Sequence, residues 1–147
     1  MRFREIIVYQ VVLVVVGAFI VFVGLNVGLG GIQTMGWQVP SGFVGVTNAA
    51  NFLVQDSHVR FLGGLFGAVG VFMIIGATQI KRYHAELRLV FVLIFVGGLA
   101  RFSAFDSAVL FGANIITSLA TELLVMPILF FWLPRVVQQE QARRKTD

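Results

Sequence analysis

Residues 6–28 have the sequence IIVYQVVLVVVGAFIVFVGLNVG, a stretch without a charged side chain. A helix needs about 20 consecutive apolar residues to cross the hydrocarbon core of a bilayer, so this stretch is long enough to span it. It is longer than the apolar core of a signal peptide, and no cleavage-site pattern follows, so we expect an uncleaved transmembrane helix. Tyr9 and Gln10 are expected to anchor it at the membrane interface.

Three further apolar stretches of similar length follow, at residues 59–80, 87–105 and 113–133. Inside a bilayer each must be a helix, because an open strand would leave backbone polar groups unpaired. Residues 47–51 are expected to begin a helix that leads into the second span. The sequence therefore predicts an all-α, polytopic membrane protein. It forms an antiparallel four-helix transmembrane bundle over residues 1–135, followed by a polar cytoplasmic tail over residues 136–147.

The composition also indicates a lipid environment. Apolar residues make up 58% of the 147 residues and charged residues 12%, against about 45–50% and about 25% in soluble domains. The formal net charge of +4 comes from Lys and Arg at the ends of the apolar stretches. No basic stripe is interleaved with aromatic residues, so a nucleic-acid partner is not expected. The absence of cysteine excludes disulfides and thiolate metal sites.

The positions of Lys and Arg predict the orientation in the membrane. Nine of the eleven basic residues fall on one side of the predicted bundle: Arg2, Arg4, Lys81, Arg82, Arg88, Arg135, Arg143, Arg144 and Lys145. Cytoplasmic loops carry an excess of Lys and Arg, so both termini are expected in the cytoplasm. The loop over residues 29–57 has no Lys or Arg and is expected on the outer side.

Small residues recur along the predicted helices. Gly63 and Gly67 form a GxxxG pair, and Gly64 with Ala68 repeats the spacing. Such residues let two membrane helices approach closely, so that backbone contact replaces the missing hydrophobic drive. We interpret the pattern as packing within one chain, with a seam between two copies as the alternative.

Polar residues line one face of the fourth apolar stretch. They lie at positions i, i+3, i+4, i+7 and i+8 of a helix: Asn114, Thr117, Ser118, Thr121 and Glu122. Lipid does not accommodate such a row, so this polar stripe must face protein or water. Pro127 has no N–H for the Leu123 carbonyl, which predicts a kink just beyond Glu122.

Two ion pairs follow from counting residues along the helices. Arg101 lies thirteen residues from Arg88 and Glu122 thirteen residues from Arg135, so both are roughly 19 Å from the same boundary. Equal depth predicts an Arg101–Glu122 pair. A similar count places Arg60 near Asp106 at the outer edge, with Asp56 and His58 as other partners for Arg60.

Three short segments resemble a known family. They are VRFLGG at residues 59–64, GGLARFS at 97–103 and ELL at 122–124. Together they resemble a bacterial family of small membrane proteins known as domain of unknown function 4345, and more distantly DoxX-type four-helix proteins. The resemblance implies a multi-pass, four-helix protein of the bacterial inner (plasma) membrane with no assigned activity.

Two interpretations of the polar residues stay open: a ligand-binding pocket, or a structural lock that holds the helices in register. The candidate pocket comprises Arg60, Arg101, Asp106 and the five stripe residues. His58 and His84 are expected on opposite sides of the membrane and so cannot share a metal. No histidine base lies near Ser103 or Ser107. No catalytic residue, metal or cofactor is therefore assigned.

Three classes of function remain. The first is a non-enzymatic binding or accessory subunit that lies in the bilayer, belongs to a larger membrane complex or a homo-oligomer, and holds an amphipathic small molecule. The second is a small proton-coupled transporter in which Glu122 titrates. The third is a lipid- or quinone-modifying membrane enzyme. The lack of recognisable catalytic machinery favours the first.

Overall fold

The computed structural model describes residues 2–35, 46–113 and 115–143. Within these ranges the chain contains helices and no strand. Four helical segments are long and apolar enough to cross a membrane: Arg4–Gly30, Ala49–Thr78, His84–Ala104 and Ile116–Ala142. The all-α fold class and the four predicted spans are therefore confirmed, and the protein is a multi-pass helical membrane protein.

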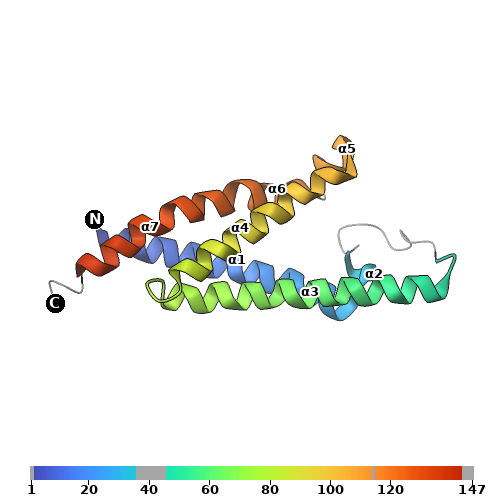
Figure 1. Ribbon diagram of the computed structural model, residues 1–147, viewed down its shortest axis with the longest axis horizontal. Helices are drawn as coiled ribbons and strands as arrows, with labels where there is room; N and C mark the ends of the chain where they lie inside the picture. The colour runs from blue at the N-terminus through green and yellow to red at the C-terminus, as the bar shows by residue number, and fades with distance from the viewer. Residues whose placement is uncertain (1, 36–45, 114, 144–147) are drawn as a thin grey trace. The chain divides into compact units, whose positions relative to one another are not determined.

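The helices differ in their bounds from the predicted spans. In chain order they are α1 (Arg2–Gly30), α2 (Ile32–Met35), α3 (Ala49–Thr78), α4 (His84–Ala100), α5 (Ser107–Leu110), α6 (Ile116–Ala120) and α7 (Met126–Arg143) (Figure 1). A 3₁₀ turn, Arg101–Ala104, extends α4, and a π-helical turn, Thr121–Val125, joins α6 to α7. The helix expected to begin within residues 47–51 is present, since the Asn48 side chain accepts a hydrogen bond from the Asn51 N–H at the start of α3.

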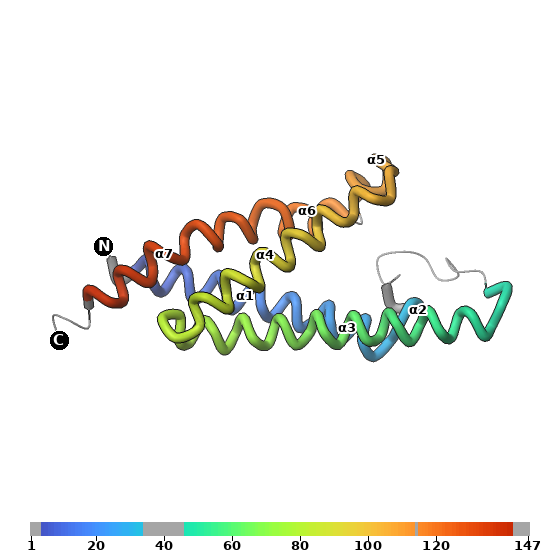
Figure 2. The backbone as a smooth tube through the Cα atoms, viewed as in Figure 1, coloured from blue at the N-terminus to red at the C-terminus, as the bar shows by residue number. Residues whose placement is uncertain are grey.

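The chain divides into two compact units, Val12–Ile75 and a second that combines Met1–Val11 with Gly76–Asp147. In the first unit α1 and α3 run antiparallel (Figure 2). Their backbones touch at glycines: a Cβ added to Gly24 would lie 2.3 Å from the Gly67 nitrogen, and one added to Gly63 would lie 2.4 Å from the Gly28 nitrogen. The GxxxG pair thus packs within one chain, as interpreted from the sequence.

The second unit is built on α4 and α7, which also run antiparallel and lie side by side (Figure 1). Its most deeply buried apolar residues come from the start of α1, the end of α3 with the turn after it, and these two helices: Tyr9, Ala77, Ile80, Leu87, Phe91, Met126, Leu129, Leu133 and Val136. In the same unit the Glu5 carboxylate accepts a hydrogen bond from the Gln139 side chain. The start of α1 and the end of α7 are therefore neighbours.

The expectation for Tyr9 at the start of the first span is wrong. Tyr9 is no interfacial anchor, because it is fully buried, donates its hydroxyl hydrogen bond to the Leu129 carbonyl (3.1 Å) and packs edge-on against Trp132. At the other end of the chain, α7 continues through Pro134 to Arg143, so the segment expected as a polar tail, residues 136–147, begins as helix. Burial of Val136 and Val137 explains the continuation, since their apolar contacts outweigh the hydrogen bond lost at the proline.

Candidate functional site

The site centres on the ion pair that the sequence predicts between the third and fourth spans. Arg101 begins the 3₁₀ turn after α4, and Glu122 lies in the π-helical turn before α7. The Arg101 Nε donates to Oε2 of Glu122 and its Nη2 donates to Oε1, both at 2.6 Å. This is a two-bond arrangement in which a planar guanidinium matches a planar carboxylate, the strongest geometry for such a pair. The predicted Arg101–Glu122 pair is therefore present.

A glycine on α4 makes room for the carboxylate. A Cβ added to Gly98 would lie 2.7 Å from the Glu122 Cβ and 3.2 Å from its Oε2. Its neighbour Gly97 has no such role, since nothing lies within 4 Å of a Cβ built there. Of the two glycines in the GGLAR segment, only Gly98 is therefore required by the close approach of Glu122 to α4.

The backbone that carries Glu122 departs from regular α-helix. The Met126 N–H donates to the Thr121 carbonyl, five residues back, instead of the usual four. Such single π-helical turns often mark functional sites. Pro127 follows directly and cannot donate a backbone hydrogen bond, so the sequence predicted a break at this point. The structure resolves that break as a π-helical turn, whose extra residue rotates Glu122 relative to the helix beyond it.

The ion pair is not sealed. The Arg101 side chain is 37% exposed and the Glu122 side chain is 11% exposed. The guanidinium has five N–H groups, and the described residues provide acceptors for two of them, both on Glu122. Leu99 and Phe102, on either side of Arg101, are exposed apolar residues. Arg101 therefore offers open donors beside an apolar surface.

The polar stripe differs from its prediction in part. Thr117 is exposed, and Ser118 and Thr121 are half-buried. The Thr121 hydroxyl donates back to the Thr117 carbonyl at 2.9 Å, so it is satisfied within its own helix. Asn114 lies outside the described residues. Within the described part of the chain, the stripe brings Glu122 to Arg101, whereas the hydroxyl of Thr121 bonds to its own helix and not to that pair.

Of the partners expected for Arg60, the structure shows Asp56. Arg60 forms an ion pair with Asp56, one turn earlier on α3, with 2.6 Å between Nε and Oδ2. Its two other nitrogens donate to the carbonyls of Leu29 and Gly30 at the end of α1, Nη2 reaching Gly30 at 3.3 Å. Arg60 thus caps the last turn of α1, whose carbonyls have no partner within the helix.

Asp56 makes a further contact at the same end of the α1–α3 hairpin. Its Oδ1 accepts the Ile32 N–H at 2.8 Å, which holds α2 against α3. Gly31, between α1 and α2, has a φ of 71° and lies so close to Asp56 that a Cβ there would be 1.9 Å from Oδ1. Both the left-handed backbone and the contact require glycine at this position. Arg60 and Asp56 therefore have a structural role in the unit that contains them.

Asp106 is not the partner of Arg60 that the sequence first predicted. Its Oδ1 accepts the Val109 N–H at 3.1 Å and caps the short helix α5. Asp106 and Arg60 belong to different units, and each has a partner within its own. Among the described residues no group of three or more His, Asp or Glu side chains could hold a metal ion.

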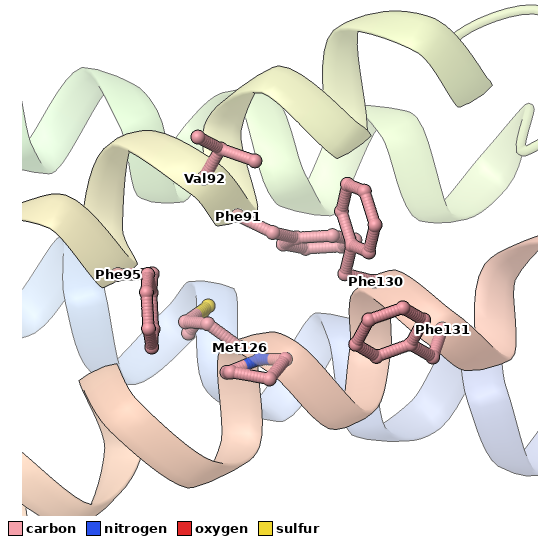
Figure 3. Close-up of a pocket in the computed structure, with 7 residues that line it drawn as sticks. Phe91, Val92, Phe95, Met126, Phe130 and Phe131 are labelled. Atoms are coloured by element: carbon pink, nitrogen blue, oxygen red, sulfur yellow. The ribbon is translucent and has the colours of Figure 1, made fainter.

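Sequence reasoning missed an apolar groove between α4 and α7 (Figure 3). Its volume is about 250 Å³, and it is lined by Phe91, Val92, Phe95, Met126, Pro127, Phe130 and Phe131. The spacing Phe91, Val92 and Phe95 places three of these on one face of α4. In a chain with fifteen phenylalanines this spacing does not stand out, so the sequence offered little to separate a groove from ordinary lipid-facing residues.

Comparison with known proteins gives one finding. No curated protein and no solved structure matches the chain. A family model matches residues 8–133, which include both antiparallel hairpins and the Arg101–Glu122 pair. The family resemblance drawn from the three short segments is thereby confirmed. The chain belongs to the family described as a domain of unknown function, DUF4345.

Proposed function

We propose that this protein is a non-enzymatic binding or accessory protein of the bacterial inner membrane, with its ligand site at the open edge of Arg101. The observation that supports the proposal is that most N–H groups of the Arg101 guanidinium have no acceptor among the described residues. Two of its N–H groups hold Glu122, and the side chain is still 37% exposed. An arginine at membrane depth is costly unless its donors are satisfied, so the open donors favour a bound acceptor.

The surroundings of Arg101 suggest the chemistry of the ligand. A guanidinium favours carboxylate, phosphate or carbonyl oxygens. Exposed Leu99 and Phe102 favour a hydrophobic body beside that polar head. A small amphipathic acid, a lipid or a quinone meets both demands. Glu122 then acts as a positioning residue, because its two hydrogen bonds fix which edge of the guanidinium is presented.

The transporter alternative requires the Arg101–Glu122 pair to break and form again in every cycle. Proton uptake by Glu122 would remove the charge that holds Arg101, so each cycle would break two 2.6 Å hydrogen bonds inside the bilayer. A static binding site needs no such step. The enzyme alternative requires a reactive group near Arg101, and the described residues around the pair include no histidine. Binding is therefore the function that we infer from this geometry.

Native mass spectrometry of the detergent-solubilised protein tests the proposal with two matched probes. Oleate carries a carboxylate, and oleyl alcohol has the same chain without one. The wild type is expected to retain oleate over oleyl alcohol by about tenfold, since a charge-assisted hydrogen bond contributes about 1.5–3 kcal/mol. Arg101→Lys keeps the charge but loses the fork of donors, so this preference should fall.

Two outcomes would contradict binding at Arg101. One is equal retention of both probes by the wild type. The other is an unchanged preference in Arg101→Lys that is shown by circular dichroism to be folded. A companion experiment addresses the transporter. Liposomes containing the protein should show no proton flux above that of Glu122→Gln, and a flux that depends on Glu122 would favour the transporter instead.

A further inference from the structure

The apolar groove between α4 and α7 has a charged residue at one end. Arg88 lies one helical turn before Phe91 and Val92 and two turns before Phe95, so it shares their face of α4. Its guanidinium carbon lies 4.4 Å from the centre of the Phe130 ring, which lines the same groove from α7. An arginine and an aromatic groove therefore form one continuous surface.

Arg88 is available for a partner from outside the chain. It is exposed, and neither ion pair formed among the described residues involves it. A guanidinium stacked on an aromatic ring still presents its N–H groups around its edge. Such an edge suits an anionic oxygen, above all a phosphate. The stacking on Phe130 holds that edge at the mouth of the groove.

The groove itself is suited to a flexible apolar chain. All seven lining residues are apolar, and the structure places the exposed side chains of Val92 and Phe131 at its rim (Figure 3). From Arg88 to Phe95 the helix rises roughly 10 Å, which gives the length of the groove below the charge. A molecule that fits has a negative head at Arg88 and a hydrocarbon segment alongside the phenylalanines.

We propose that this groove binds an anionic phospholipid from the leaflet in which Arg88 lies, with the phosphate on Arg88 and one acyl chain along the groove. Charge complementarity favours an anionic headgroup over a zwitterionic one, because Arg88 is exposed and forms no ion pair among the described residues. The proposed phosphate position at Arg88 is distinct from Arg101, which lies thirteen residues further along the chain, roughly 19 Å away.

The experiment compares two lipids on the full-length protein. Protein reconstituted in vesicles of phosphatidylethanolamine with a minor fraction of phosphatidylglycerol is released into the gas phase, and the retained lipids are weighed by native mass spectrometry. The wild type should retain phosphatidylglycerol in excess of its share of the vesicle. Arg88→Gln should reduce this enrichment about tenfold, the equivalent of one charge-assisted hydrogen bond.

Arg82 provides the matched control. Its guanidinium also stacks on an aromatic ring, that of Tyr83 at 5.1 Å, and it is exposed in the same part of the chain, but the ring on which it stacks does not line the groove. Arg82→Gln should leave the enrichment unchanged. An equal loss in both variants would mean general attraction of anionic lipid to basic residues, and it would overturn the proposal.

A second pair of variants tests the groove independently of charge. Val92→Trp places a large ring at the rim of the groove, whereas Leu93→Trp changes the next residue, which is exposed and does not line it. Val92→Trp should lower the retention of phosphatidylglycerol and Leu93→Trp should not. The proposal is wrong if the wild type shows no enrichment. It is also wrong if the species displaced by Val92→Trp is a second copy of the chain instead of lipid.

Discussion

Arg101 and Glu122 join α4 to the π-helical turn before α7 through two hydrogen bonds of 2.6 Å, one to each carboxylate oxygen. Both residues lie within spans that are long enough to cross a membrane. Removing a charge from water is costly, and the cost is offset when the partner lies in good geometry. The pair therefore fixes the register of the two helices whether or not it also holds a ligand.

Breaking this pair from either side should destabilise the protein more than removing it altogether. Arg101→Ala and Glu122→Ala each leave one uncompensated charge, which costs about 3–5 kcal/mol for a buried pair. Because the Arg101 side chain is 37% exposed, we expect the lower end of this range. The double variant should lose clearly less than the sum of the two single losses.

Unfolding in mixed micelles with increasing sodium dodecyl sulfate measures these free energies, and the double-mutant cycle isolates the coupling between the residues. Leu124→Ala is a suitable control, since Leu124 is in the same π-helical turn and is 62% exposed. Strict additivity of the two single losses would show that the pair is not formed in the protein.

Gly98 and Gly97 are expected to respond in opposite ways to alanine. In Gly98→Ala the new Cβ would lie 2.7 Å from the Glu122 Cβ, so helix α4 or the π-helical turn must shift. Overpacking of this kind costs about 1–3 kcal/mol. Gly97→Ala meets nothing within 4 Å, and it should be neutral or stabilise α4 by up to about 1 kcal/mol. The same unfolding assay compares the two adjacent substitutions, and equal losses would contradict the close contact.

Much of this arrangement was predictable from the sequence for simple physical reasons. The number of spans follows from the lengths of the apolar stretches. The Arg101–Glu122 pair follows because both residues lie thirteen residues from the basic residue that ends their span. The intramolecular role of Gly63 and Gly67 follows from the need of membrane helices for close contact. In each case one strong physical requirement acts on residues that can be counted along a helix.

The features that escaped prediction depend on contacts that counting cannot give. Of the partners expected for Arg60, the structure shows Asp56 and not Asp106, and the hydrogen bonds by which Arg60 caps α1 were not foreseen. Local pairing is favoured because i and i+4 positions are neighbours in any helix. Tyr9 is of a residue type that often anchors helices at the membrane interface, yet it is buried, and its hydroxyl donates to the Leu129 carbonyl. The π-helical turn adds one residue to a helix whose spacing was assumed regular.

Both termini are predicted to lie in the cytoplasm. The sequence basis is the asymmetry of Lys and Arg. The contact between Glu5 and Gln139 supports the same-side placement of the two ends, since it joins the start of α1 to the end of α7. Alkaline phosphatase fused after Arg143 should be inactive, and the same reporter inserted between Val46 and Thr47 should be active. The reverse pattern would invert the orientation. Activity at both positions would place the loop and the C-terminus on the same side, which contradicts the predicted crossings.

The polar stripe is predicted to be reachable by water from the outer side as far as Ser118. Lipid does not solvate a row of hydroxyl groups, so Thr117 and Ser118 must face either water or packed protein. The chain contains no cysteine, so single cysteines can be introduced without removing any native thiol. Thr117→Cys, Ser118→Cys and Thr121→Cys place a thiol at increasing depth towards Glu122. In intact cells a membrane-impermeant maleimide should label the first two and should label Thr121→Cys more slowly.

Leu124→Cys is the control, because Leu124 is 62% exposed but is expected to face lipid, where the reagent cannot enter. A thiol that is merely exposed to lipid would thus be distinguished from one that is exposed to water. Labelling at Ser118 but not at Leu124 would support a water-filled approach to Arg101 and hence the ligand site. Labelling at none of the three stripe positions would mean that the stripe is packed against protein, and the Arg101–Glu122 pair would then serve only to hold the helices in register.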